Sequence, residues 1–510
     1  MFIQKQSHVA IKTLCCSSLP YYLTIIVIAG GGYLASLLPG VGYSGDTAKF
    51  QFIGKVLGTP HATGYPLYIM LNHLFVSIFP IGSLAYRANL LSAVFAVGAV
   101  CVLFFIFQRL RVHSLIALFT CIMFAFTPIF WSQSIIAEVY SLHALMMLLT
   151  LSFLILWYID KKDKYLLIGL VVYAIAFGNH MSSILLAPGI GLFVLVTKWQ
   201  VLCDWKKVLF VCVVIICSSL QYGYLFWRYY DPSTQFIEMQ VPNLSTFLWY
   251  LKGAQFRNLM FAFPWPDIIQ VRIPMFWQLI FDQYHLLVVL GIIGLFVFKQ
   301  YKVSLLLMVY FVCNAVYGIN YKIPDIEPYF IPNFIVIVIY MGIGLNFLWQ
   351  RISLKIPEKS LLLIAIVPLF FLFLNFDSIS QHQNVTIDND IKKAFEFVGK
   401  DALIISPNYH YSCYFWYYLI GEKVGSPRNI YLLHHFNDGK VCRYLNEKET
   451  IYLPEQRINI LPSLKVYFFL PRESNYREAV KEIIFKLSQQ NLKIIKCSDQ
   501  LVLIQSCGTS

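Results

Sequence analysis

Charged residues are scarce in this chain of 510 residues. Only 13% of the residues are Asp, Glu, Lys or Arg, whereas 58% are hydrophobic. A soluble protein carries about 25% charged residues, so this chain has too little polar surface to face water along its whole length. We therefore expect an integral membrane protein in which most of the chain faces lipid.

Several motifs of well-known enzyme and binding classes are also missing. The sequence has no P-loop, no dinucleotide fingerprint, no Gly-x-Ser-x-Gly elbow and no metal-ligand spacing. Nothing therefore supports a cofactor or a metal, although a divalent metal is left open. The net charge of +13 comes without a basic cluster containing interleaved aromatic residues, which argues against nucleic acid. In a membrane protein, such a charge is typical of cytoplasmic loops and contact with anionic membrane lipids.

Apolar runs predict about eleven membrane-spanning helices. Each run is long enough, or nearly so, to cross about 30 Å of hydrocarbon. We expect the shorter runs to be tilted or to end inside the bundle. The predicted spans lie at about 20–40, 88–108, 114–131, 141–159, 165–178, 182–198, 207–226, 283–298, 303–319, 330–349 and 360–376.

Basic residues predict the orientation of these spans. If the N-terminus is cytoplasmic, every cytoplasmic turn is short and basic, as the positive-inside rule requires. These turns contain Arg109, Arg111, Lys161, Lys162, Lys164, Lys198, Lys206, Lys207, Lys299, Lys302, Arg351, Lys355 and Lys359. The opposite loops are longer and richer in aromatic residues and prolines. This orientation places the end of the chain outside.

The outer side contains two large loops and a tail. The loops run from about 41 to 87, with a short interfacial or re-entrant helix at 67–79, and from about 227 to 282. Residues 1–376 are thus the predicted transmembrane domain, and residues 377–510 a small soluble α/β domain. The tail should contain a helix in YREAVKEIIFKLSQQ and two strands in KIIKCSDQLVLIQS. Its cysteines, Cys413, Cys442, Cys497 and Cys507, could pair in an oxidising compartment.

Ionisable residues near the outer face are candidates for function, because a charge at that depth usually faces a cavity or a partner. Asp46 directly follows the first span, and His61 precedes the turn at Gly64, Tyr65 and Pro66. A carboxylate and an imidazole beside a flexible backbone suit acid–base chemistry. The alternative is an ordinary loop carboxylate and an interfacial histidine.

Three further outer segments carry polar residues. One is a turn with Glu138, Tyr140 and His143, which could equally be a solvated loop with aromatic residues at the membrane interface. The second is a polar break with Asn179 and His180, which line a cavity or simply form a turn. The third, residues 320–332, contains Tyr321, Lys322, Asp325 and Tyr329. Lys322 could bind a phosphate or pair with a neighbouring acid.

Five segments resemble a known membrane family. They are GDTAKFQFIGKVLGTPHATGYPLY (45–68), YRANLLSAV (86–94), AEVYSLH, GNHMSSILLAPG and NYKIPDIEPYFIP, in the same order. The family, long of unknown function, has animal members that are protein O-mannosyltransferases and belongs to the GT-C class of glycosyltransferases. The resemblance covers about residues 20–335. The tail is similar, less specifically, to a soluble domain found in bacterial relatives.

The resemblance implies a catalytic carboxylate in the first outer loop, a place that Asp46 occupies. Many relatives carry a Glu three residues later, where this chain has Lys49. We therefore expect one catalytic carboxylate in that loop, with Lys49 as a candidate contact to a donor phosphate.

The implied reaction moves a sugar, by default mannose or another hexose, from a polyprenyl phosphate to an acceptor hydroxyl on a protein, lipid or glycan. Asp46 would accept the hydroxyl proton as the hydroxyl oxygen attacks the anomeric carbon, and direct displacement predicts inversion at this carbon. Glu138 would orient the acceptor or hold a histidine. Cations would stabilise the leaving phosphate. The candidates for binding the donor are Lys49, Tyr65, Tyr140, His143, Asn179, His180, Lys252, Arg257, Tyr321, Lys322, Asp325 and Tyr329, with His61 as a further hydrogen-bond donor.

Two other classes of protein share some of these features. A transporter or flippase of lipid-linked sugars would also have many spans, but transporters usually show two related halves, and no such repeat is found. An assembly protein with a membrane anchor would not need eleven spans. Short loops and an outer tail favour a bacterial inner membrane with a periplasmic C-terminal domain.

Overall fold

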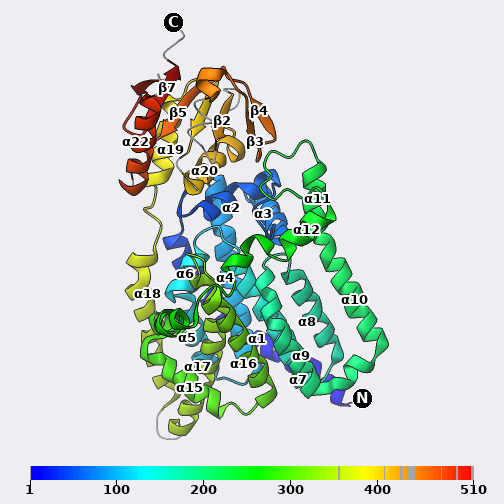
Figure 1. Cartoon of the computed structure of the whole chain (residues 1–510). Coiled ribbons are helices and arrows are strands. Elements are labelled where there is room, and N and C mark those ends of the chain that lie inside the picture. The colour runs from blue at the N-terminus through cyan, green and yellow to red at the C-terminus, as the bar shows by residue number, and fades with distance from the viewer. Residues whose placement is uncertain are drawn as a thin grey trace.

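The computed structural model describes residues 2–353, 357–406, 408–424, 429–433, 443–472, 474–489 and 492–506. A long helical bundle carries a smaller sheet-containing domain at one end, called the sheet end below (Figure 1). The beginning of the first helix lies at the opposite end of the molecule (Figure 1). The predicted class, a polytopic helical membrane protein with a small α/β domain, is confirmed.

The described part of the chain before residue 380 contains eighteen α-helices. They are α1 (Phe2–Ser36), α2 (Gly45–Val56), α3 (Pro66–Ile78), α4 (Leu84–Arg109), α5 (Ser114–Ala125), α6 (Pro128–Ser134), α7 (Tyr140–Asp160), α8 (Asp163–Ala176), α9 (Ala187–Lys198), α10 (Trp205–Ser219), α11 (Gly223–Tyr230), α12 (Leu244–Leu251), α13 (Trp265–Asp267), α14 (Ile273–Tyr284), α15 (Val288–Val297), α16 (Tyr301–Asn320), α17 (Ile331–Ile352) and α18 (Ile366–Ile379). Short 3-10 or π segments join several of them into longer rods.

Nine helical stretches of the described residues are long and apolar enough to cross a membrane, or ten if one bent pair counts as a span. They are Ser18–Ser36, Leu84–Arg109, Tyr140–Asp160, Met181–Cys203, Trp205–Tyr230, Trp265–Val297, Tyr301–Asn320, Glu327–Ile352 and Glu358–Ile379. Nine or ten of the roughly eleven expected spans therefore meet this criterion of length and composition.

Two segments explain the difference. Helix α8 has 14 residues, so by itself it reaches about 21 Å at 1.5 Å per residue. It nevertheless leads the chain from the far end of α7 back to His180 at the cavity. Helices α5 and α6 meet at a 70° bend. The bend lies at Thr127, whose extended backbone is the conformation favoured before a proline, here Pro128.

The first loop at the sheet end contains a helix that the sequence analysis did not foresee. Helix α2 begins after Ser44, whose side chain accepts a hydrogen bond from the backbone N–H of Thr47 and so caps the helix. Asp46 lies in the first turn, where the helix dipole favours a negative charge. The following helix α3 begins with Pro66 and has 13 residues, so it is too short to span, as expected.

The tail folds around a mixed sheet of five strands. The strand order is β2-β1-β5-β7-β6; β2, β1 and β5 are parallel, and β7 is antiparallel to both of its neighbours. The elements are α19 (Thr386–Phe397), β1 (Ala402–Ile405), α20 (Tyr409–Trp416), β2 (Ile430–Leu433), β3 (Ile451–Leu453), β4 (Ile458–Ile460), β5 (Lys465–Phe469), α22 (Ser474–Ser488), β6 (Leu492–Lys496) and β7 (Leu501–Ser506). The expected helix is α22, and the expected strand pair is β6 and β7.

The tail cysteines fall into two groups. Cys413 and Cys497 are free thiols. Cys442 and Cys507 lie outside the described residues, so pairing that involves them stays a prediction.

The two faces of the sheet pack against different partners, because successive strand residues point to opposite sides. Leu403 and Ile405 belong to a small core together with residues of α22. Ala402 and Ile404 belong to a larger core that also contains residues of α19, α20, α2 and α3. The sheet domain and the sheet end of the bundle therefore share one continuous apolar core.

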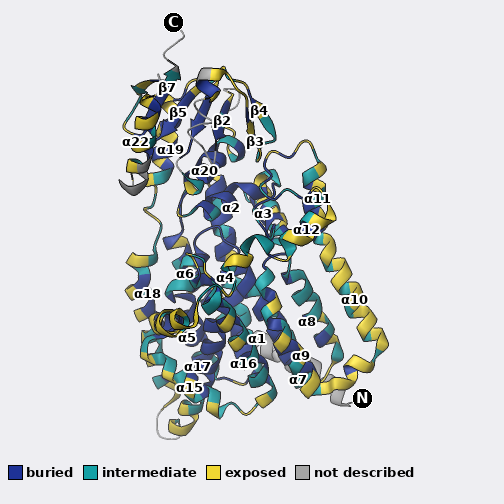
Figure 2. Ribbon diagram, viewed as in Figure 1, coloured by how far each residue is buried: buried dark blue, intermediate teal, exposed yellow. Residues whose placement is uncertain are grey.

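Burial along the bundle fits a membrane location. Helix α10 is exposed along much of its length, and none of its described residues is buried (Figure 2). Its side chains are mostly apolar, so lipid is the solvent that suits them. In contrast, most residues of α17 from Ile331 to Gly344 are buried inside the bundle.

The contact between α15 and α17 offers a test of this packing. A Cβ atom on Gly344 would clash with the carbonyl group of Leu290, whereas a Cβ atom on Gly191 of α9 would meet nothing within 4 Å. We expect Gly344→Ala to lower the free energy of unfolding by about 1–3 kcal/mol through overpacking. Gly191→Ala should not destabilise the protein. Thermal unfolding of both variants in detergent checks this, and equal behaviour would contradict the close helix contact.

Candidate active site

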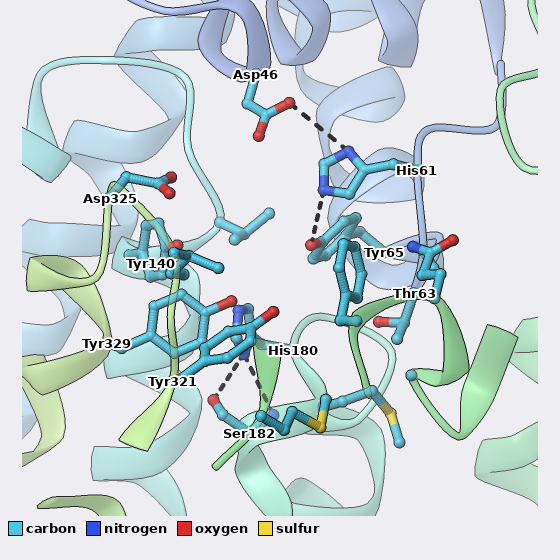
Figure 3. A pocket seen from close by; sticks show the side chains of 18 of the residues that line it. Asp46, His61, Thr63, Tyr65, Tyr140, His180, Ser182, Tyr321, Asp325 and Tyr329 are labelled. Carbon is cyan, nitrogen blue, oxygen red and sulfur yellow. Dashed lines mark hydrogen bonds and ion pairs between the residues drawn. The ribbon is translucent and has the colours of Figure 1, made fainter. Parts of the chain in front are cut away.

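A cavity of about 680 Å³ lies at the sheet end, where several loops meet the helical bundle. Asp46 and His61 of the first outer loop and Glu138 of a separate segment all line it. Of the predicted donor-binding residues, the following also line the cavity: Tyr65, Tyr140, His180, Lys252, Tyr321, Asp325 and Tyr329. Figure 3 shows Asp46 and His61 on one side of the space and the tyrosines Tyr321 and Tyr329 on the other.

Asp46 presents its carboxylate to the cavity from the first turn of α2. Its Oδ1 atom lies 2.9 Å from Nζ of Lys49, one helical turn away. Burial alone would raise the pKa of Asp46, but the opposing effects of its neighbours, of which the positive charge of Lys49 is the largest, together outweigh burial and lower the pKa well below its usual range. The second carboxylate oxygen points into the cavity (Figure 3). Asp46 is therefore an ionised acceptor at neutral pH.

Lys49 lies behind the cavity wall and is fully buried. Four acceptors share the three N–H groups of its ammonium: Asp46, Glu238 at 3.0 Å, the hydroxyl of Tyr409 and Nδ1 of His61. Burial disfavours the charged form, but the two carboxylates outweigh burial and raise the pKa of Lys49. The ammonium thus makes its hydrogen bonds to protein side chains. It stabilises Asp46 and does not line the cavity itself.

The tautomer of His61 follows from this arrangement. Its Nδ1 atom lies within hydrogen-bond distance of Lys49 Nζ, which can only donate, so Nδ1 accepts. The proton of the neutral ring is then on Nε2, which lies 3.2 Å from the hydroxyl of Tyr65. Burial and then the charge of Lys49 lower the pKa of His61, which favours this neutral form. His61 can therefore donate a hydrogen bond from its Nε2 side.

Glu138 is another carboxyl group in the same cavity, and it differs from Asp46 in its protonation state. Burial, followed by the negative charge of Asp46, raises the pKa of Glu138 to about 8. The hydroxyl of Thr47 donates to its Oε1 atom at 3.0 Å. At neutral pH Asp46 is therefore ionised and Glu138 is largely protonated, an arrangement that separates acid and base roles.

Aromatic rings form the wall opposite Asp46. The rings of Tyr321 and His180 lie 5.6 and 5.3 Å from that of Tyr329, and Tyr140 lies 5.8 Å from it. His180 also shares the hydroxyl of Ser182 with His143, at 2.6 and 3.3 Å, so His143 supports the wall from behind. Aromatic faces of this kind pack well against the apolar face of a sugar ring.

The three candidate cations, Lys252, Arg257 and Lys322, differ in their position relative to the cavity. Lys252, just after α12, lines the cavity. Arg257 and Lys322 are exposed and are not among the lining residues, and Lys322 lies over the ring of Phe263. Asn179 is buried behind the lining, where its Nδ2 atom donates to the carbonyl of the lining residue Val139. Lys252 is therefore better placed than Arg257 or Lys322 to meet a ligand phosphate.

Glu238 and Tyr409 are among the lining side chains that sequence reasoning missed, and both contact Lys49. Glu238 is positioned by a short pairing between the two large loops, in which its N–H donates to the carbonyl of Thr59 at 2.8 Å. Tyr409 comes from the tail and begins α20. Neither residue lies in a motif, and both reach the site only through contacts between distant parts of the chain.

A resident metal finds little support in the described part of the chain, where no group of three or more His, Cys, Asp and Glu side chains is arranged to hold an ion. Asp46 and Glu238 contact Lys49, and Glu138 accepts a hydrogen bond from Thr47. We therefore assign no metal-binding residue.

Comparison with known proteins agrees with the resemblance found in the sequence. Residues 46–203 match the family model of the protein O-mannosyl-transferase TMEM260 N-terminal domain. The mouse protein O-mannosyl-transferase TMEM260 is 33% identical over 152 residues, which are 29% of this chain and 21% of the mouse protein. The Dictyostelium discoideum protein of the same name is 25% identical over 170 residues, 32% of this chain and 20% of that protein. The chain thus spans about one fifth of the length of these relatives.

Solved structures extend the comparison to almost the whole chain. ArnT from Cupriavidus metallidurans bound to undecaprenyl phosphate superposes with a TM-score of 0.59 and 11% identity, over 96% of this chain and 97% of ArnT. The chain, superposed on ArnT over almost its whole length, therefore has the GT-C fold. The oligosaccharyltransferase of Archaeoglobus fulgidus, in complex with Zn and sulfate, gives a TM-score of 0.50 and 13% identity over 89% of this chain and 67% of that protein. The GT-C likeness therefore includes the sheet domain as well as the bundle.

The protonated state of Glu138 can be tested through stability. Because the folded protein holds this proton more tightly than an unfolded chain, Glu138 stabilises the fold at low pH. That contribution is lost as the pH rises from near 4.5 through about 8. We expect Glu138→Gln, which is neutral at every pH, to lose less thermal stability than the wild type between pH 6 and pH 9. Identical losses would show that Glu138 is ionised throughout this range.

Proposed function

We propose that this protein is a membrane glycosyltransferase that moves a hexose from a polyprenyl-phosphate donor to an acceptor hydroxyl, with inversion. The observation that carries the proposal is the ionised Asp46, held by buried Lys49 at the edge of a cavity of about 680 Å³. A cavity of this size has room for a sugar phosphate and an acceptor hydroxyl together. The names of the relatives and the ligand of the ArnT structure support mannose and a polyprenyl phosphate, respectively.

The reaction needs one base and no strong acid. The acceptor oxygen attacks the anomeric carbon while Asp46 takes the hydroxyl proton. The bond between that carbon and the phosphate oxygen breaks, and its electron pair leaves with the polyprenyl phosphate. Direct displacement from the face opposite the phosphate inverts the anomeric carbon. The low pKa of Asp46 keeps it ready to accept at neutral pH, although it makes Asp46 a modest base.

Other lining groups suit the remaining tasks. Lys252 stabilises the charge that develops on the leaving phosphate. Protonated Glu138 donates a hydrogen bond to the acceptor or the sugar. The aromatic wall around Tyr329 packs against the sugar ring. The lipid chain lies between apolar helices of the bundle, and the acceptor is a hydroxyl of a protein, a lipid or a glycan.

The proposed location follows from the basic turns in the sequence. The N-terminus is cytoplasmic, and the cavity and sheet domain face the opposite side, which in a bacterium is the periplasmic face of the inner membrane. A transporter of lipid-linked sugars is the alternative function. It would move the donor across the membrane without breaking its glycosidic bond to phosphate, so product analysis separates the two.

The direct test incubates the purified protein with a panel of polyprenyl-phosphate hexoses and acceptor peptides or lipids. We expect release of polyprenyl phosphate and a new glycosidic bond in the wild type. Asp46→Asn should reduce transfer by at least about 100-fold, the contribution typical of a general base. Asp267→Asn, at an exposed position outside the cavity, is the matched control. Full transfer by a folded Asp46→Asn protein would contradict the assigned base.

The cation at the cavity provides a second prediction. Lys252→Ala should raise KM for the donor by about tenfold, the effect of losing roughly 1.4 kcal/mol of charge-assisted binding. Lys322→Ala should leave KM within about twofold, because Lys322 lies outside the cavity wall. Steady-state kinetics with varied donor concentration measures both. Equal effects of the two substitutions would show that the phosphate binds elsewhere.

A further inference from the structure

The sheet domain reaches the catalytic loop through the first residues of α20. Helix α20 begins at Tyr409, and its N-terminal end lies against the N-terminal end of α2. Gly45 marks the contact, since a Cβ atom there would lie 3.0 Å from the Cα atom of His410 and 3.1 Å from the ring of Tyr409. The two helix ends therefore meet at the place where Asp46 enters the cavity.

Tyr409 takes part in the charge cluster around Asp46. Its hydroxyl accepts from the ammonium of Lys49 and lies 3.1 Å from Oε1 of Glu238 and 3.4 Å from Oδ1 of Asp46. With one proton to donate, the hydroxyl favours the nearer carboxylate, Glu238. Tyr409 thus links Lys49 to Glu238 and helps to fix the position of the ammonium group that holds Asp46.

His410 contacts the backbone of the same loop. Its Nδ1 atom accepts from the N–H of Gly45 at 2.8 Å. The first N–H groups of a helix have no acceptor within that helix, so this bond satisfies one that would otherwise need water. It fixes the residue immediately before Asp46 and hence the direction of the Asp46 side chain.

An apolar contact supports these polar ones. Phe236 of the second large loop lies between Phe52 of α2 and Trp416 of α20, with ring centroids 5.3 and 5.1 Å away. All three are buried in the core shared by the two domains. The docking of α20 is therefore part of the folded core, and its polar N-terminal end has a defined position over the cavity.

We propose that Tyr409 and His410 are positioning residues for Asp46, so that the sheet domain completes the catalytic site. This inference rests on the proposed transferase function. Tyr409 acts through Lys49 and Glu238, and His410 acts through the backbone of Gly45. The matched family segment ends at residue 203, so these two residues lie outside the part of the chain aligned with the TMEM260 family.

The test uses the full-length protein with Tyr409→Phe, His410→Leu and His410→Asn. We expect Tyr409→Phe and His410→Leu to lower kcat about 10-fold or more, while KM for the donor stays within about twofold, because a misplaced base loses turnover and keeps binding. An Asn side chain can replace Nδ1 as an acceptor, so His410→Asn should restore at least half of the wild-type kcat. Tyr452→Phe, at an exposed position of β3, is the matched control.

Hydrogen exchange gives a readout that does not depend on activity. His410→Leu should speed amide exchange in the peptide that contains Gly45, and Tyr452→Phe should not. Unchanged kcat in Tyr409→Phe, equal losses in His410→Leu and His410→Asn, or unchanged exchange would each overturn the positioning role. In another outcome, the wild type transfers no sugar from any donor while His410→Leu still speeds exchange at Gly45. That result would overturn the proposed function but keep the contact between His410 and Gly45.

Discussion

The site depends on one buried ammonium group, that of Lys49. It lies between Asp46 and Glu238, at 2.9 and 3.0 Å. Removing one partner of a buried ion pair typically costs about 3–5 kcal/mol, because the remaining charge is left without compensation. The first loop, the second loop and the tail hydroxyl of Tyr409 therefore have to come together around Lys49 for any of these charges to be buried at low cost.

This constraint explains the protonation pattern of the cavity. Lys49 keeps Asp46 ionised and fixes the tautomer of His61. The resulting negative charge on Asp46 adds to burial in keeping a proton on Glu138, which Thr47 holds in place. A base, a neutral hydrogen-bond donor and a protonated acid are thus placed around one space by a single cation. The membrane bundle supplies the rigid scaffold below them.

Much of this architecture could be predicted from the sequence. Long apolar runs dictate spanning helices, and the match to the GT-C fold confirms the class. Period-two and helical patterns located β6, β7 and α22. Hydropathy did not reveal that the predicted span at α8 is short or that α5 and α6 meet at a bend. The helix α2 was missed, although Ser44 followed by Asp46 is a cap with an acidic first turn.

Only those site residues that stand out in their own stretch of sequence could be predicted. Asp46, His61 and Glu138 stand near apolar spans, where polar residues are conspicuous, and the structure brings them to one cavity. Lys49 was considered as a phosphate contact, but the packing buries it behind the wall. Glu238 and Tyr409 could not be found, because they lie 189 and 360 residues from Lys49. Their role depends on a loop pairing and a domain contact that no short-range pattern encodes.

The most direct measurement of the central claim is an experimental structure with a non-transferable polyprenyl-phosphate sugar analogue bound. The proposed mechanism predicts the sugar inside the cavity, the phosphate on the side of Lys252, and the opposite face of the anomeric carbon open toward Asp46. A headgroup bound outside this cavity would contradict it. So would a phosphate next to Asp46 with the anomeric carbon turned away, because the carboxylate could then not serve the attacking hydroxyl.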